Sequence, residues 1–480
     1  MKMKCDMVLT VWGEWHMNVF LNYHLRTLLS PNNFPEFSKT FETIFYIFAT
    51  GPDQKIISEN EFFNKLLEYC TVEFITLDPA QLETPFSTHH EVWQYAIDRS
   101  ALNKSYCLFL PPDVLWSDGS FKHLADLAKN GKTAIFFNNH IRSDTSRLLP
   151  YLDKKYPAKN KVISFEPRTL VKIGLENLHA LYASFVRDSN WYPRHPEVII
   201  RPIKNQGVLT TFTAHNPWFF RGDLYELTDH RMLPWPFKEN EIHFITDSDD
   251  LFMLSLAIPG KDRPWYTENM PFNSLNFMKW WALFEKANKT CDLMIRQPGR
   301  VHYADMNEKD WEIAEHESNM HVNHLTAGRE IYSLWADLYV KGNDNAATLL
   351  AMLIELGIAS RVRNKTDKNV LLIPENEILD DKVQNIITKL HDVKERNTVI
   401  KWLRQFIIPE EVFLNNTEYK LRPQTHPTIG SMQPSDGFNY YKLGNTEITF
   451  SQSDATNMKR CSDYNKVLRF NQIKGDQFLS

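Results

Sequence analysis

Cysteine is scarce in this sequence, and the few cysteines do not fall into pairs. The 480 residues contain five of them, none in a Cys-x-x-Cys motif, namely Cys5, Cys70, Cys107, Cys291 and Cys461. An odd number of widely spaced cysteines argues against a disulfide framework and against a zinc site built from thiolates. We therefore expect a protein of a reducing compartment, the cytoplasm.

Long apolar runs and an excess of basic residues are also missing. The formal net charge is −5, and 24% of the residues are charged. No stretch approaches the roughly 18 apolar residues that a membrane-spanning helix needs, and the apolar run near the N-terminus is too short for a signal peptide. Nucleic-acid-binding domains usually carry a basic surface. These absences predict no transmembrane segment and no nucleic-acid partner.

Several common catalytic motifs are absent as well. The sequence contains no G-x-S-x-G, no G-x-x-x-x-G-K-[ST], no G-x-G-x-x-G and no H-E-x-x-H. These motifs carry the nucleophile elbow, the phosphate loop, the dinucleotide fingerprint and the zinc-protease helix, so those classes are set aside.

What is present is an alternation of short apolar stretches with amphipathic ones. The pattern predicts strands at residues 7–11, 43–49, 72–77, 106–110 and 133–137, and helices at 19–29, 58–69, 89–101 and 121–129. Such alternation is typical of an α/β fold with a mixed, mostly parallel, Rossmann-like sheet flanked by helices. In such sheets ligands bind beyond the carboxyl ends of the strands, which makes the loops at these ends the first place to look for a site.

The pattern is less regular after residue 160. We expect a long helix at 168–186, strands at 198–202, 208–214 and 242–246, a helix at 273–287 and a strand within 293–303. After about residue 325 helices are expected at 324–338, 344–356 and 379–406, followed by β-like pieces such as 447–451. The predicted organisation is an α/β domain at 1–325, a mainly helical region at 326–410, and an α+β or irregular segment at 411–480.

Carboxylates follow the strand predicted at 106–110. Asp113 and Asp118 lie in the stretch Leu-Pro-Pro-Asp-Val-Leu-Trp-Ser-Asp-Gly. A carboxylate at a strand end is well placed to hold Mg²⁺ or Mn²⁺, which prefer oxygen ligands and share phosphate oxygens. The alternative is that both residues cap turns and the next helix.

A second acidic cluster follows the strand predicted at 242–246. Asp247, Asp249 and Asp250 place three carboxylates in four residues, which repel one another unless solvent, a cation or a pKa shift compensates. The functional interpretation is a carboxylate that acts at a reacting carbon or positions an acceptor. The structural interpretation is an N-cap at Asp247 for a helix that begins near Asp249.

Three further groups are candidates. His302, at the end of a late strand, is a candidate metal ligand, and Lys309 a candidate phosphate contact. In the Trp12-Gly13-Glu14-Trp15-His16 segment, Gly13 permits close backbone approach and Trp12 offers a stacking surface. His215 follows the strand predicted at 208–214. Each has a plain structural alternative, as a core histidine, a covered sheet edge or a turn.

The order of these pieces resembles that of GT-A-fold glycosyltransferases. Residues Leu110 to Val114 resemble the strand end that carries the Asp-x-Asp motif of that family, with Pro111 at the position of the first Asp. Residues 247–251 resemble the D-Q-D-x-L-N element, and 302–311 resemble the H-x-x-G-x-x-K-P-W element, of the glycogenin-like retaining branch. The Trp-Gly-Glu-Trp-His start and the segment after Leu110 are also similar to bacterial proteins described as glycosyltransferase-like.

The resemblance implies transfer of a sugar from a nucleoside diphosphate donor to an acceptor, with Mg²⁺ or Mn²⁺. Donor binding then falls to Trp12, Gly13, Glu14, Asp113, Asp118, His215 and Lys309, and the metal to Asp113 and His302. Asp247, Asp249 or Asp250 would face the transferred sugar. Two alternatives stay open: a nucleotidyltransferase or metal-dependent phosphohydrolase, and a non-catalytic nucleotide-sugar-binding protein.

Overall fold

The computed structural model describes most of the chain up to residue 335. The described residues are 2–335, except 84, 158–160, 190–196, 214–217, 225–237 and 260–292, together with five short strands after residue 368. The chain divides into two compact units, one made of Met1–Phe272 and Phe284–Asn319 and the other of Asn273–Leu283 and Met320–Ser480. The division falls within helix α14 (Glu308–Trp335). The finer partition into 326–410 and 411–480 stays a prediction.

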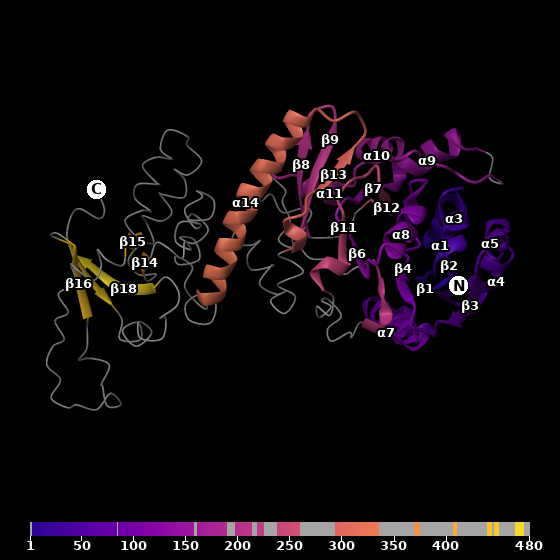
Figure 1. The fold of residues 1–480 in the computed structure, drawn as a ribbon, viewed down its shortest axis with the longest axis horizontal. Coiled ribbons are helices and arrows are strands. Elements are labelled where there is room, and N and C mark those ends of the chain that lie inside the picture. Colours follow the sequence, from indigo (N-terminus) through magenta and orange to yellow (C-terminus); the bar gives the residue numbers. More distant parts are fainter. Residues whose placement is uncertain are drawn as a thin grey trace. The chain divides into compact units, whose positions relative to one another are not determined.

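A seven-stranded sheet forms the centre of the first unit, with strand order β11-β6-β10-β4-β1-β2-β3 (Figure 1). Its strands are β1 (Met3–Thr10), β2 (Phe41–Ala49), β3 (Thr71–Thr76), β4 (Tyr106–Phe109), β6 (Ala134–Phe137), β10 (Phe219–Arg221) and β11 (Ile242–Ile245). Only β10 runs antiparallel to its neighbours. The predicted fold class, a mixed and mostly parallel sheet, is confirmed.

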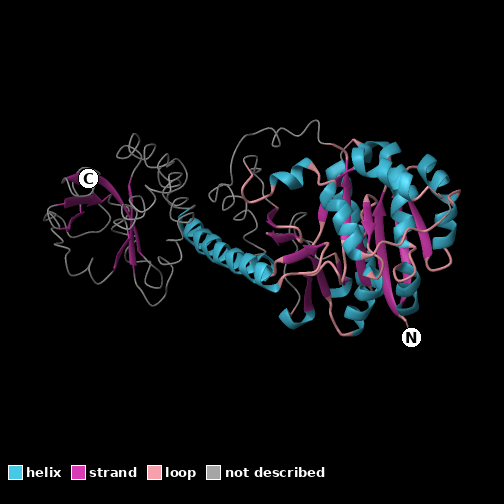
Figure 2. Ribbon diagram, turned by 90° about the horizontal axis from the view of Figure 1, so that it is seen from above, coloured by secondary structure: helices cyan, strands magenta, loops and turns pink. Residues whose placement is uncertain are grey.

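Helices cover this sheet (Figure 2). The described helices up to residue 184 are α1 (Glu14–Val19), α2 (Leu25–Leu28), α3 (Phe34–Thr40), α4 (Gly51–Ser58), α5 (Glu61–Leu66), α6 (Pro79–Leu82), α7 (Pro85–Asn103), α8 (Ser120–Lys129), α9 (Thr145–Lys155), α10 (Pro167–Glu176) and α11 (Ala180–Ser184), of which the last three pack against the smaller sheets. A π-helical stretch, η1 (Phe20–His24), joins α1 to α2. Because both faces are covered, the strands carry nearly continuous apolar runs, as in β1, where the last six residues are all buried.

Aromatic rings fill the layer between the sheet and two helices. Phe37 of α3 stacks on Phe41 of β2 with ring centroids 4.4 Å apart. It also meets Phe121 of α8 at 5.7 Å and Phe219 of β10 at 6.1 Å. All four side chains are fully buried, and rings of this size each bury roughly 150–250 Å². The cluster therefore fixes α3 and α8 against the sheet.

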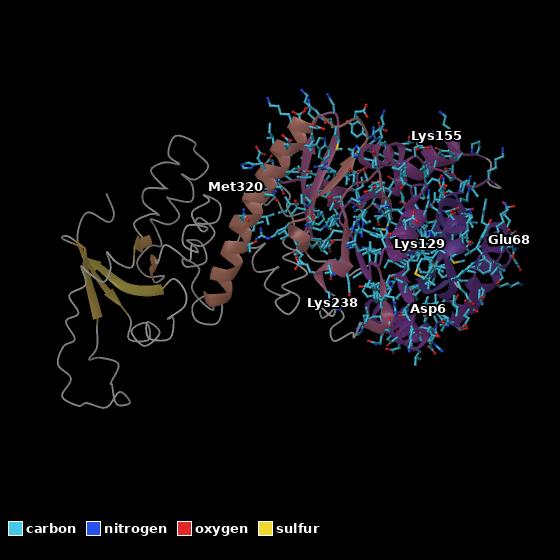
Figure 3. All side chains as sticks on the ribbon, in the orientation of Figure 1. Asp6, Glu68, Lys129, Lys155, Lys238 and Met320 are labelled. Carbon is cyan, nitrogen blue, oxygen red and sulfur yellow. The ribbon has the colours of Figure 1, made fainter. Side chains whose placement is uncertain are left out.

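Charged side chains lie mostly on the outside of this unit, as Glu68, Lys129 and Lys155 do (Figure 3). Asp6 of β1 is a buried exception. Its carboxylate accepts hydrogen bonds from the Ser105 hydroxyl at 2.6 Å and the Asn103 side chain at 2.9 Å. Asn103 ends α7 and Ser105 lies between α7 and β4, so this acid holds that connection against β1.

The first unit also contains two three-stranded sheets. One has the order β5-β12-β7, from β5 (Val114–Trp116), β12 (Met253–Ala257) and β7 (Ile141–Asp144). The other has the order β13-β9-β8, from β13 (Gly299–His302), β9 (Gly207–Phe212) and β8 (Val198–Ile203). Neither β5 nor β7 was predicted as a strand from the sequence, because each is only three or four residues long.

Two predicted helices were wrong in detail. The helix expected at 168–186 is two helices, α10 and α11, because the backbone between them pairs with β7 instead. Asp144 N donates to Asn177 O at 2.8 Å, and His179 N donates to Arg142 O at 2.9 Å. The helix expected to begin near Asp249 is a turn that leads into β12. Tertiary hydrogen bonds outweigh helix propensity at both places.

The described residues after 368 lie in a five-stranded sheet. Its order is β15-β14-β18-β17-β16, from β14 (Asn369–Pro374), β15 (Ile407–Pro409), β16 (Asn439–Leu443), β17 (Thr446–Phe450) and β18 (Lys466–Lys474). Strand β17 corresponds to the piece predicted at 447–451. The helices predicted at 344–356 and 379–406 fall outside the described residues. No helix among the described residues is long and apolar enough to cross a bilayer.

Gly299 provides a test of how closely β13 approaches its neighbours. A Cβ atom at this position would lie 2.0 Å from the backbone oxygen of Asn138, which cannot move aside as a flexible side chain can. We expect Gly299→Ala to lower the free energy of unfolding by about 1–3 kcal/mol, measured by thermal or urea denaturation. Gly51→Ala, at a position with nothing within 4 Å, is the matched control. Equal stability of the two variants would contradict this packing.

Candidate functional site

The carboxyl ends of four strands meet at one edge of the large sheet. Strands β1, β4, β6 and β11 all run in the same direction, since β10 is antiparallel to both β4 and β6. The segments that follow them are 11–16, 110–113, 138–140 and 246–252. These are the segments where a sheet of this kind binds ligands, and they contain most of the predicted site residues.

A pocket of about 390 Å³ opens at the ends of β1 and β4. Three tryptophans, two histidines and one carboxylate dominate its wall, and the full lining is Val8, Thr10, Trp12, His16, His89, Trp93, Phe109, Leu110, Pro111, Pro112, Asp113 and Trp218. Trp12 and Asp113, both predicted from the sequence to bind the donor, line this pocket together. Among the described residues the lining contains no lysine or arginine, so the pocket suits a flat, weakly charged ring.

The titratable groups of this pocket also favour a low charge. Burial raises the pKa of Asp113, against the opposing influence of Arg142 and His16. Burial lowers the pKa of His16, although Asp113 counteracts the effect. Burial and the neighbouring His16 lower the pKa of His89, whose ring lies 5.6 Å from that of Trp12. These groups can exchange hydrogen bonds with a neutral ligand at modest electrostatic cost.

Other residues assigned to donor binding lie outside this lining. Gly13 has a positive φ of 78° and precedes α1, so its lack of a side chain serves the turn. Glu14 is exposed at the first position of α1. Lys309 is an exposed residue of α14. His215 lies outside the described residues. Their part in donor binding stays a prediction.

Asp118 has local partners of its own. Its carboxylate accepts hydrogen bonds from the Ser30 hydroxyl at 2.8 Å, from the Asn32 backbone at 2.8 Å and from the Asn32 side chain at 2.9 Å. These bonds tie the turn before α3 to the start of α8. The structural alternative for Asp118 therefore has direct support, and its ligand-binding role stays a prediction.

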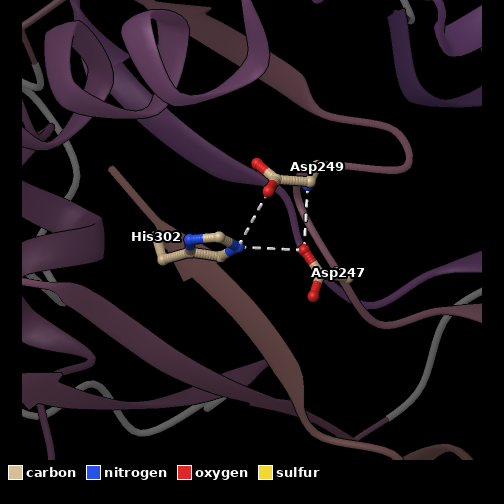
Figure 4. A group of neighbouring side chains, drawn as sticks. All are labelled: Asp247, Asp249 and His302. Atoms are coloured by element: carbon tan, nitrogen blue, oxygen red, sulfur yellow. Dashed lines mark hydrogen bonds and ion pairs between the residues drawn. The ribbon is translucent and has the colours of Figure 1, made fainter. Parts of the chain in front are cut away.

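Asp247, Asp249 and His302 converge at the end of β11 (Figure 4). His302 Nε2 lies 3.0 Å from Asp247 Oδ1 and 3.7 Å from Asp249 Oδ2. Asp249 N donates to Asp247 Oδ1 at 2.9 Å, which closes a tight turn. These residues belong to two elements that the sequence pattern treats separately, and His302 follows Asp247 by 55 positions in the chain.

Backbone pairing with β13 creates this convergence. Arg300 N donates to Thr246 O at 2.6 Å, and Ser248 N donates to Arg300 O at 2.9 Å. The buried Ser248 hydroxyl then accepts a hydrogen bond from His302 N at 3.1 Å. Ser248 is thus a positioning residue, a role that was not predicted from the sequence. Beneath the imidazole, the buried Trp311 ring lies edge-on to that of His302, with centroids 6.1 Å apart.

The electrostatics of the group are those of an ion pair. Burial alone would raise the pKa of Asp247, but hydrogen bonds from His302 and from the Asp249 amide hold it below its usual value. Burial alone would lower the pKa of His302, but the hydrogen bonds to Asp247 and to Ala304 O, with the charges of both carboxylates, raise it. Protonated His302 therefore neutralises part of the acidic charge.

The same three side chains also fit a divalent cation. His302 Nδ1 donates to Ala304 O at 3.1 Å, so a neutral imidazole presents the lone pair of Nε2 to the carboxylates. The three donor atoms lie within 4.8 Å of one another. Ligand atoms about 2.1 Å from a shared ion require separations of this order. Two carboxylates and one imidazole suit Mn²⁺ better than Mg²⁺, which takes almost only oxygen. Asp113 and Asp250 are not members of this group, and their assigned roles stay predictions.

Arg168 is a member of the site that the sequence analysis missed. Its guanidinium makes three contacts of 2.9–3.1 Å with the Asp249 carboxylate and one of 2.5 Å with Asp305. The residue lies on α10, 81 positions before Asp249, in a segment that the pattern marked only as amphipathic helix. No signal in a single sequence pairs such distant residues.

No protein-family model matches the chain, and no curated protein matches its sequence. Among solved structures the chain is similar to S. aureus TarS, with a TM-score of 0.24 and 9% sequence identity. The alignment covers 93% of this chain and 64% of the TarS chain, so this chain spans only part of that protein's length. A similarity at this TM-score says nothing of the function.

The ion pair can be tested without any ligand. Removing the charge of Asp247 in Asp247→Asn removes the strongest influence that raises the pKa of His302, so that pKa should fall. NMR titration of the His302 ring signals measures the shift. Asp250→Asn, which removes the same charge from an exposed neighbour outside the group, should produce a much smaller change. If His302 titrates identically in the wild type and in Asp247→Asn, the contact is not formed in solution.

Proposed function

We propose that this protein is a metal-dependent glycosyltransferase that uses a nucleoside diphosphate-sugar donor. The observation that carries the proposal is the convergence of Asp247, Asp249 and His302. These residues come from the two segments that resemble separate elements of GT-A-fold glycosyltransferases. Each of these sequence resemblances is of low specificity alone. Their contact in the folded protein supports both, because segments that resembled the family by chance would not be expected to lie together.

The position of the aromatic pocket supports the same function. The pocket lies at the ends of β1 and β4, and the Asp247–Asp249–His302 group lies at the end of β11, on the same edge of the sheet. Three strand spacings separate β4 from β11, which is roughly 14 Å at about 4.8 Å each. An extended ligand with a flat ring at one end and phosphates at the other fits this arrangement.

In the proposed function each of these groups of residues has a separate role. Trp12 and Trp93 stack on the base, and Asp113 accepts a hydrogen bond from it. Asp247, Asp249 and His302 would hold the cation. Bound there, a divalent ion would neutralise the charge that develops on the departing diphosphate. Asp250, exposed on the same turn, is the carboxylate left to face the sugar or the acceptor.

Two alternatives use the same residues differently. A nucleotidyltransferase or phosphohydrolase would act at phosphorus, and Pro111, at the position of the first Asp of the family motif, is compatible with a binding protein that has lost catalysis. The products separate these functions. A glycosyltransferase releases a nucleoside diphosphate, a pyrophosphatase releases the monophosphate, and a binding protein releases neither.

A thermal-shift panel of nucleoside diphosphate-sugars, with and without Mn²⁺, tests the proposal directly. A ligand at 100 times its dissociation constant stabilises the folded state by about 2.7 kcal/mol, which raises Tm by a few degrees. We expect at least one donor to do so, more strongly with Mn²⁺. The proposal fails if no donor shifts Tm under either condition.

Variants should separate the two halves of the donor site. His302→Gln should abolish the Mn²⁺-dependent part of the shift, because the amide is a much weaker ligand than imidazole. Trp12→Ala should weaken donor binding with and without metal by about 1–3 kcal/mol, or roughly fivefold to 150-fold in affinity. Asp126→Asn, an exposed acid on α8, is the control and should behave as the wild type. Identical donor affinities in all four proteins would contradict both assignments.

A further inference from the structure

Arg168 and a bound cation require the same oxygen atom. Asp249 Oδ2 is the atom that faces His302 Nε2 at 3.7 Å in the group that fits a metal. The same atom accepts hydrogen bonds from Arg168 Nη2 at 2.9 Å and from Arg168 Nε at 3.1 Å. Both guanidinium and metal carry positive charge, so they compete for Asp249 and repel each other when close.

The second partner of Arg168 does not hold it firmly. Arg168 Nη1 lies 2.5 Å from Asp305 Oδ1, but the Asp305 side chain is 97% exposed. Ion pairs between exposed groups contribute little, because water screens them and both side chains lose conformational freedom. The side chain of Arg168 is itself 42% exposed. A guanidinium that leaves Asp249 is therefore free to turn toward a ligand.

An anion bound to the metal is the natural partner for that guanidinium. The planar fork of arginine matches two oxygens of a phosphate as well as it matches a carboxylate. Arg300, a second arginine near the group, is already engaged with Glu315, with Nε 2.6 Å from Oε1. Among the described cationic side chains near Asp249, Arg168 is thus the one that would give up Asp249 to a metal ion and bind a phosphate instead.

We propose that Arg168 is an exchangeable partner of Asp249: it occupies the carboxylate in the metal-free protein, and it contacts a phosphate of the diphosphate once a divalent cation takes Asp249. The second half of this inference rests on the proposed function, whereas the first half concerns the metal alone. Arg168 would then couple the two ligands, since metal binding releases the residue that the diphosphate needs.

This coupling predicts two effects of opposite sign in Arg168→Gln. Calorimetry with Mn²⁺ alone should show affinity at least several-fold above that of the wild type, because the competing guanidinium is gone. Calorimetry with UDP and with GDP at saturating Mn²⁺ should show affinity for the favoured nucleotide at least tenfold below that of the wild type, because a charge-assisted bidentate contact is lost.

Two further variants sharpen the measurement. Arg168→Lys keeps the positive charge without the fork, so its nucleotide affinity should lie between those of the wild type and Arg168→Gln. Arg221→Gln is the matched control, because Arg221, the last residue of β10, forms a similar two-point pair with Asp223, at 2.7 and 2.8 Å. Arg221→Gln should leave both affinities unchanged.

The outcomes distinguish this inference from the proposed function. If Arg168→Gln binds Mn²⁺ no more tightly than the wild type, or loses metal and nucleotide affinity together, Arg168 merely supports the acidic turn and the inference is overturned. If the wild type binds Mn²⁺ but no nucleotide, the proposed function fails, and the Mn²⁺ measurement alone still decides whether Arg168 competes for Asp249. Metal binding by Arg168→Gln but not by the wild type would be the clearest support.

Discussion

The parallel direction of β1, β4, β6 and β11 is the constraint on which the candidate site depends. Parallel strands deliver their carboxyl ends to one edge of a sheet, whatever the distance between them along the chain. Here they bring together segments near residues 12, 113, 139 and 247. The antiparallel strand β10 widens the edge without disturbing this order, because it enters between β4 and β6 and adds a strand spacing. An aromatic pocket and an acidic group therefore share one edge while remaining apart.

The aromatic pocket and the Asp247–Asp249–His302 group provide different electrostatic environments. The pocket between β1 and β4 contains a single carboxylate and two histidines, and burial shifts each of them toward its neutral form. At the end of β11, hydrogen bonds from His302 and from the Asp249 amide hold the pKa of Asp247 below its usual value, and Arg168 forms an ion pair with Asp249. A ligand with both a flat ring and a phosphate group needs one environment of each kind.

The sequence predicted those features that depend on local pattern. Six of the seven strands of the large sheet were predicted from apolar runs, all except β10, and the acidic turn was recognised from three carboxylates in four residues. Asp247, Asp249 and His302 were all named from the sequence, although Asp113 rather than Asp249 was expected to share the metal with His302. The geometry favours Asp249, because pairing of Arg300 with Thr246 and Ser248 aligns β13 with the acidic turn and not with the end of β4. Contacts between distant segments produce no periodic pattern in a single sequence. Such contacts determine the positions of Arg168 and Ser248 and the formation of the short strands β5 and β7.

The position of β10 in the sequence, after β4 and β6, affects the order in which the strands of this sheet can pair during folding. Its three residues, Phe219 to Arg221, pair with residues 106–108 of β4 on one side and residues 134–135 of β6 on the other. The ribosome delivers β4 and β6 long before β10, and until then both strands present unpaired edges. Because such contacts span more than 80 residues, closing them is slow relative to local helix formation. Exposed edges of this kind attract other chains, so the interval before β10 emerges is when the nascent protein most needs protection from aggregation.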